Sequence, residues 1–217
     1  MSTDQLVRIP FLIEFHHLDV ENLVIFFISV LAAITVNAEA QAVMATALGD
    51  IQKDSKERFH FNPFQHLDIS GLLCFAVAGF GWPRRVFVEP RRFKYPGLYL
   101  ILTRFAGPFA NLLLAGIAGS IVSVMQSMGV EDQVFKKLLV INLMVFVFSF
   151  LPVPPLAGAS LFSAFLPKGR NAWGTVSARV FPYLFVLALI ILKINHVEIL
   201  DRFFYPLVRS LFSFITK

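Results

Sequence analysis

The polar residues best placed for chemistry lie in the middle of a long apolar run. Asn37 and Gln41 are four residues apart, and Glu39 lies between them. Residues at positions i and i+4 share one face of a helix, so the two amide side chains can meet. Polar groups at membrane depth are costly and usually face protein or water. We therefore expect this half of the helix to point into a helical bundle and to form amide hydrogen bonds there.

Histidine and cysteine offer little for a metal site. The single cysteine, Cys74, excludes a disulfide framework and any multi-cysteine metal centre, and its apolar surroundings favour inert packing. The five histidines are His16, His17, His60, His66 and His196. His60 and His66 flank the Asn62-Pro63 turn, at a spacing that matches no helical zinc signature. Because these residue types also serve as hydrogen bonders in loops, a metal centre built from them is the less favoured interpretation.

The elements that position these residues are those of a membrane protein. Of the 217 residues, 57% are hydrophobic and 15% are charged, and the mean hydropathy is +0.71. A soluble domain is about half apolar and about a quarter charged, so the composition excludes a disordered chain and disfavours an ordinary cytosolic domain. The net charge of +5 is better explained by basic cytoplasmic loops than by nucleic-acid binding. We predict an all-α polytopic membrane protein with about four to six membrane segments.

The apolar runs give the expected segments. The long ones cover residues 20–48, 98–125, 138–151 with flanks, and 176–194. We expect Gly107-Pro108 to break the second of these, and the three prolines between Leu151 and Leu156 to end the third. A short apolar tail at 203–215 is expected to lie at the membrane interface.

A twelve-residue apolar run, Ile69 to Phe80, is too short to cross a membrane. It spans about 18 Å, against about 30 Å for the bilayer core, and therefore predicts a re-entrant segment. Because the triplet Val86-Phe87-Val88 has strand-like composition, we expect residues 69–95 to contain a small re-entrant, β-like element. The chain then divides into an N-terminal interfacial segment, 1–19, and a membrane domain, 20–217.

Basic residues gather on the segments before and after the short run. Lys53, Lys56 and Arg58 precede it, and the run that follows it comprises Arg84, Arg85, Arg91, Arg92 and Lys94. If 69–80 is re-entrant, all eight lie on one side, which is expected to be cytoplasmic. The favoured role of the later run is a cytoplasmic anchor, and the alternative is binding of anionic lipid headgroups or an acidic partner.

Four motifs together resemble one protein family. They are Ala45-Thr46-Ala47-Leu48-Gly49-Asp50, the stretch from Phe61 to Gly71, Ala106-Gly107-Pro108-Phe109-Ala110-Asn111, and the stretch from Leu151 to Gly158. Their order and spacing resemble the site-2 protease family of intramembrane zinc metalloproteases, in its short bacterial form without a PDZ domain. The resemblance runs from about residue 20 to the C-terminus. It implies a membrane core whose loop carries a histidine at the position of His66, where it orders that loop. It also implies that Gly107-Pro108 with Asn111 forms a helix-packing and polar contact near the core, which Asn142 on the next segment is expected to face.

The resemblance also implies where catalysis would be. The family places His-Glu-x-x-His on a membrane helix, with two zinc ligands and a general base, and takes an Asp ligand from a later Pro-rich turn. Counting from the Gly49-Asp50 pair puts these four positions at Asn37, Ala38, Gln41 and Ala157. Amides are poor zinc ligands beside imidazole, and alanine supplies neither a ligand nor a base. If the motif is shifted by one residue so that Glu39 becomes the base, the two ligand positions fall on Ala38 and Ala42, which offer no ligand atoms.

We therefore expect a pseudoprotease without a cofactor, which keeps the family's groove to hold a transmembrane or extended segment of another membrane subunit. The candidate groove residues are Asn37, Gln41, Asn62, His66, Asn111, Asn142, Pro154 and Pro155. Expected partners are membrane proteins and lipids, with no nucleic acid, in a bacterial inner membrane. Two alternatives remain: a metalloprotease with a rebuilt site that uses Glu39, His66 or residues of a partner, and a transport or lipid-binding protein.

Overall fold

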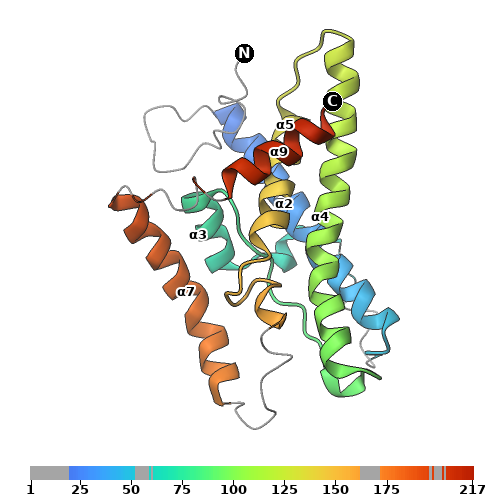
Figure 1. Ribbon diagram of the computed structural model, residues 1–217, viewed down its shortest axis with the longest axis vertical. Helices are drawn as coiled ribbons and strands as arrows, with labels where there is room; N and C mark the ends of the chain where they lie inside the picture. Colours follow the sequence, from blue (N-terminus) through green and yellow to red (C-terminus); the bar gives the residue numbers. More distant parts are fainter. Residues whose placement is uncertain are drawn as a thin grey trace.

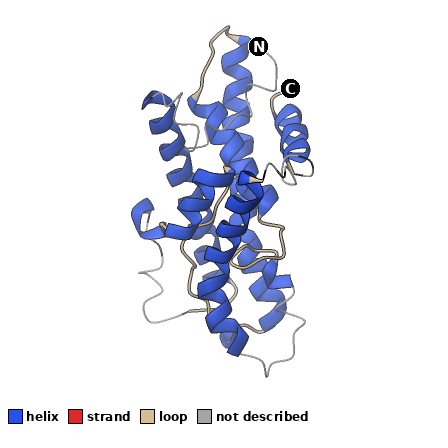
Figure 2. Ribbon diagram, turned by 90° about the vertical axis from the view of Figure 1, so that its left-hand side faces the viewer, coloured by secondary structure: helices blue, strands red, loops and turns tan. Residues whose placement is uncertain are grey.

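The computed structural model describes residues 20–51, 59, 61–161, 172–195, 197, 202 and 204–217, without the side chains of 172–179. The proposed interfacial segment 1–19, the basic residues Lys53, Lys56 and Arg58, and His16, His17, His60 and His196 lie outside this description. Within it, all regular structure is helical, as the blue ribbons of Figure 2 show. The all-α prediction is confirmed for these residues.

Three helices form the centre of the bundle. They are α2 (Val20–Ala47), α4 (Pro96–Ser127) and α5 (Val134–Phe148), and each packs on the other two. In Figure 1, α2 and α5 cross beside the long α4, which runs the height of the molecule. Helix α5 is the most enclosed, with buried side chains on nearly every turn. This central position explains why its sequence is apolar all round rather than on one face.

Shorter elements surround this centre. Helix α3 (Ile69–Ala78) packs on α7 (Ala172–Ile194), and α9 (Tyr205–Ile215) lies across α5 and α4. Two 3₁₀ turns, η3 (Pro63–His66) and η4 (Pro90–Arg92), lie in the connections on either side of α3. Asp68 caps α3 by accepting from the Gly71 amide, and Asn62 caps η3 by accepting from the Phe64 amide.

Helices α2 and α4 are long and apolar enough to cross a membrane. With 28 and 32 residues, they measure about 42 Å and 48 Å, more than a bilayer core of about 30 Å. Shorter apolar helices occur at Ile69–Ala78 and Val180–Ile194. Two candidate spans are thus found among the described residues, and the expected four to six are not confirmed.

Two local expectations differ from the structure. Helix α4 continues through Gly107-Pro108 without a break, because packing against α2 and α5 holds its axis although proline lacks the N–H for one bond. The triplet 86–88 forms no strand within the described chain. The Val86 carbonyl instead accepts from Arg104, so the β-like part of the re-entrant element is not confirmed. By contrast, α5 ends at Phe148, just before the prolines, as predicted.

Candidate functional site

A chain of amide side chains crosses the centre of the bundle. Gln41 Nε2 donates to Asn37 Oδ1 at 2.8 Å, and Asn37 Nδ2 donates to Asn111 Oδ1 at 2.6 Å. Asn111 Nδ2 donates in turn to Asn142 Oδ1 at 2.7 Å and to the Ala33 carbonyl at 2.9 Å. All four amides are buried. They join α2, α4 and α5, so the expected Asn37–Gln41 and Asn111–Asn142 contacts are both confirmed.

A close approach of two helices makes this chain possible. A Cβ at Gly107 would lie 2.4 Å from Asn37 Oδ1 and 2.8 Å from the Asn37 carbonyl oxygen. Only glycine leaves room for α2 to come this near to α4. On α2, Ala33 and Ala38 are fully buried, and their small side chains also allow close packing. The Gly107-Pro108 pair therefore serves close packing of the two helices.

A cation begins the amide chain. Arg104 on α4 donates through Nη1 to Gln41 Oε1 at 2.9 Å and to the Val86 carbonyl at 3.1 Å. Every link then runs in one direction, from the guanidinium through Gln41 and Asn37 toward α5, and aligned hydrogen bonds of this kind polarise and strengthen one another. Arg104 was not predicted from the sequence, because a lone arginine in an apolar run gives no sign of its partner.

The Pro-rich turn brings the fourth family position to the same place. After α5 ends, the chain folds back, and the Gly158 amide donates to the Ser149 carbonyl at 2.8 Å. This bond sets Ala157 and Pro155 beside the end of α5. Both line a pocket together with Asn37, Gln41 and Arg104.

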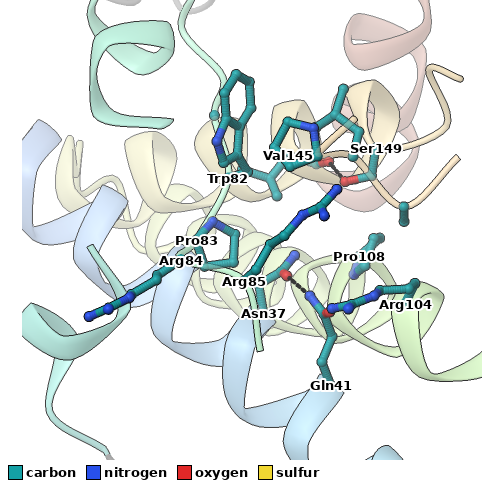
Figure 3. A pocket seen from close by; sticks show the side chains of 14 residues that line it. Asn37, Gln41, Trp82, Pro83, Arg84, Arg85, Arg104, Pro108, Val145 and Ser149 are labelled. Atoms are coloured by element: carbon teal, nitrogen blue, oxygen red, sulfur yellow. Dashed lines mark hydrogen bonds between the residues drawn. The ribbon is translucent and has the colours of Figure 1, made fainter. Parts of the chain in front are cut away.

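The pocket is small and mixed in character. Its volume is about 30 Å³, which holds about two water molecules. The remaining lining residues are Gly81, Trp82, Pro83, Arg84, Arg85, Pro108, Val145, Ser149 and Leu156. Figure 3 shows Arg85 reaching across the pocket toward Ser149, whereas Arg84 points away. Asn142 does not line the pocket, so the pocket contains only some of the residues that were expected to form the groove.

A buried pair next to this site was not predicted. His66 Nε2 lies 3.0 Å from Glu39 Oε1, and both side chains are almost fully buried. The contact joins η3 to the polar half of α2, which agrees with the expected loop-ordering role of His66. Glu39 was considered only as a residue of a shifted or rebuilt catalytic site, and its contact with His66 was missed because His66 lies 27 positions later in the sequence and no local pattern connects the two.

Other predicted groove residues lie elsewhere. Asn62 is exposed, and its side chain caps η3. Pro154 is half-buried in the turn but does not line the pocket, unlike its neighbour Pro155. The structure therefore brings the amides, Pro155 and Ala157 together, and leaves Asn62 and Pro154 outside.

The basic run divides into two groups. Arg84 and Arg85 line the pocket, and surrounding protein lowers the pKa of Arg85 by desolvation, partly offset by the Asp68 carboxylate. The second group lies away from the pocket. Arg92 donates to the Ile51 carbonyl at 2.6 Å and lies 3.8 Å from buried Asp50. Arg91 is exposed, with Glu89 4.0 Å away, and Lys94 Nζ lies 5.6 Å from the centre of the Tyr95 ring.

The residues at the family's catalytic positions do not fit a zinc ion. Zinc in proteins takes thiolate, imidazole and carboxylate ligands, whereas Asn37 and Gln41 offer amide oxygens that already accept from Gln41 and Arg104. Ala38 and Ala157 offer no donor atom. Across the described residues, no three His, Cys, Asp or Glu side chains gather closely enough to hold a metal. What the arrangement supplies is hydrogen bonding and positive charge.

Comparison with known proteins identifies the family. The chain is 36% identical over 154 residues to a Bacillus subtilis (strain 168) protein named "Putative zinc metalloprotease YwhC", and the match covers 67% of this chain and 70% of the relative. No family model and no solved structure matches the chain. The apolar helices α2 and α4 fit the membrane protein expected from the sequence. The chain belongs to the site-2 protease-like family of this relative.

Proposed function

We propose that this chain is a non-catalytic member of its family, a multi-pass protein of a bacterial inner membrane that holds a segment of another membrane subunit. One observation carries the proposal: an amide chain occupies the positions where the family binds metal. Asn37 and Gln41 are committed to hydrogen bonds with Asn111 and Arg104. Taking up a metal would break the links that join α2 to α4.

The general base is also missing. The base position is Ala38, whose side chain is fully buried, and the pocket lining, as far as the described residues show it, includes arginines and no carboxylate. A metal-bound water needs a group within hydrogen-bond reach to accept its proton. The pocket supplies donors instead of an acceptor of that kind.

The partner-holding role is supported by what surrounds the pocket. The chain from Phe80 to Glu89 has neither helix nor strand structure, and Phe87 within it is 69% exposed. Large apolar side chains are also exposed along α4, including Leu98, Leu102 and Phe109. Exposed apolar surface of this extent faces either lipid or the helices of a partner.

Metal analysis and co-purification test this proposal on one sample. The full chain is purified in mild detergent with its native partners, and zinc content, co-purifying chains and cleavage of a model transmembrane peptide are measured. We expect no stoichiometric zinc, no cleavage and one stoichiometric partner. Near-stoichiometric zinc with cleavage contradicts the proposal.

A matched variant checks the assignment of positions. The triple substitution Asn37→His, Gln41→His and Ala157→Asp restores the family's three ligands around one pocket. We expect this variant to gain about one zinc per chain, whereas Asn62→His, outside the pocket, gains none. Failure of the triple variant to bind zinc, with its fold intact by circular dichroism, refutes the register.

The second candidate is an enzyme with a rebuilt site, and the Glu39–His66 contact favours it. These two residues are of metal-ligand type and lie 3.0 Å apart. If they form part of a metal centre, Glu39→Gln lowers the zinc content of the native chain. Under the favoured proposal, the same substitution changes stability alone.

A further inference from the structure

The pocket has an unbalanced positive charge. Arg84, Arg85 and Arg104 all line it, and none of the described residues that line it is acidic. Arg85 and Arg104 line the same pocket, so two like charges border one cavity. The Asp68 carboxylate acts on Arg85, and its oxygen Oδ1 accepts from Ser70 and from the Gly71 amide. Two guanidinium groups that border one cavity favour the binding of an anion between them.

The hydrogen-bond donors of these arginines are only partly used. Arg104 uses Nη1 for Gln41 and Val86, and its Nη2 and Nε have no hydrogen-bond partner within the described residues. Arg85 has no hydrogen bond to any described residue, and Figure 3 shows its guanidinium in the pocket. Both side chains therefore present free N–H groups to the cavity.

These donors favour phosphate chemistry. The planar guanidinium matches a phosphate with two parallel N–H···O bonds, which is why arginine predominates at phosphate sites. The segments that supply the two arginines also expose large apolar side chains: Phe87 at 69% and Leu98 at 56%. Basic groups beside exposed apolar groups are what the headgroup region of an anionic membrane attracts. A soluble anion needs no such apolar border.

We propose that Arg85 and Arg104 form a binding site for a phosphate group at the former metal position, and that the phosphate is that of an anionic phospholipid headgroup. Arg104 is held in place by the amide chain, and Arg85 closes over the phosphate from the segment before η4. The inference rests on the proposed function only in that a metal centre would occupy the same pocket. Zinc analysis tests that function, and lipid retention tests this site.

Lipid retention by the full chain measures the site directly. The protein is placed in nanodiscs of phosphatidylcholine with increasing phosphatidylglycerol, and lipids retained after release are counted by native mass spectrometry. We expect one phosphatidylglycerol to remain bound in preference to phosphatidylcholine. Arg85→Gln should weaken this retention about tenfold, the effect of losing one bidentate pair. Arg85→Lys, which keeps the charge and loses the planar fork, should give an intermediate loss.

The control is Arg91→Gln, on the same basic run but outside the pocket, where the side chain is 91% exposed. It should change retention less than twofold. Equal losses for Arg85→Gln and Arg91→Gln overturn the proposal, since they show diffuse attraction to an anionic surface. Lack of preference for phosphatidylglycerol also overturns it.

Two further arms separate the sources of the anion. Inorganic phosphate is added to the detergent-purified chain, and protection of Arg85 from a guanidinium-modifying reagent is measured. Protection by phosphatidylglycerol and not by millimolar phosphate supports the lipid headgroup, whereas protection by phosphate alone assigns the site to a soluble ion and overturns the lipid assignment. Protection by an acidic peptide but by neither phosphate source replaces the proposal with carboxylate recognition.

Discussion

Replacing Asn111 by alanine tests the amide chain at its centre. Asn111 is fully buried on α4 and takes part in three hydrogen bonds: it accepts from Asn37 and donates to Asn142 and to the Ala33 carbonyl. The substitution Asn111→Ala removes all three. It also leaves Asn37 Nδ2 without its acceptor and Asn142 Oδ1 without its donor, and both residues are buried.

The magnitude follows from the number of bonds and their surroundings. Side-chain hydrogen bonds between membrane helices average about 0.6 kcal/mol and reach about 1.7 kcal/mol. Three such bonds give a loss of about 2 kcal/mol in the free energy of unfolding. The two polar atoms left unpaired raise it further, since an unsatisfied buried group costs about 1–3 kcal/mol. We therefore expect Asn111→Ala to destabilise the fold by about 4 kcal/mol or more.

The assay is reversible unfolding of the full chain in mixed micelles, followed by circular dichroism as the fraction of denaturing detergent rises. The matched control is Asn195→Ala near the end of α7, because Asn195 is exposed and its side chain bonds, among the described residues, only to the Ile191 carbonyl of its own helix. We expect the control to change stability by less than about 0.5 kcal/mol. If Asn111→Ala behaves like Asn195→Ala, the amide chain does not stabilise the bundle, and the argument for its replacing the metal fails.

Two other substitutions test the packing around the site, each by thermal unfolding in detergent. Gly107→Ala places a Cβ 2.4 Å from Asn37 Oδ1 and should lower the free energy of unfolding by about 1–3 kcal/mol. The control is Gly116→Ala on the same helix, where a Cβ meets nothing within 4 Å, and it should be neutral or stabilising by up to about 1 kcal/mol. A similar effect of the two substitutions would refute the close approach of α2 and α4. His66→Ala removes the partner of Glu39 and should cost about 2 kcal/mol, against little for exposed Gln65→Ala.

Much of the scaffold could be predicted from local signals. The first long helix was expected over 20–48 and occurs as Val20–Ala47, since an apolar run with few breakers leaves the chain one choice in a membrane. The inward direction of Asn37 and Gln41 followed from the cost of exposing amides to lipid. The prolines after residue 150 ended α5 for the steric reason that was expected.

The remaining features depended on contacts between distant segments. Gly107-Pro108 is typical of a helix break when read locally. The family resemblance indicated helix packing there instead, and the packing of α2 on α4 shows which helix approaches it. The triplet 86–88 has strand composition, but a strand needs a neighbour to pair with, and no described segment supplies one. Arg104 and the Glu39–His66 pair could not be found because their partners lie 63 and 27 positions away.

A chelator distinguishes an amide-linked bundle from a metal-linked one. In small structural zinc sites, metal binding contributes about 10–16 kcal/mol of apparent free energy. The four side-chain bonds that join Arg104, Gln41, Asn37, Asn111 and Asn142 amount to about 2–3 kcal/mol at membrane values. The amide chain is therefore a weaker cross-link than a structural zinc ion. The packing of α2, α4 and α5 on one another provides the remaining stability of the bundle. A chelator removes no cross-link from a bundle that is joined by amides.

We expect millimolar EDTA to leave the Tm of the native chain unchanged and to lower the Tm of the zinc-loaded Asn37→His, Gln41→His, Ala157→Asp variant. A drop of several degrees in the native chain would show that a metal stabilises it, contrary to the reasoning from its ligand positions.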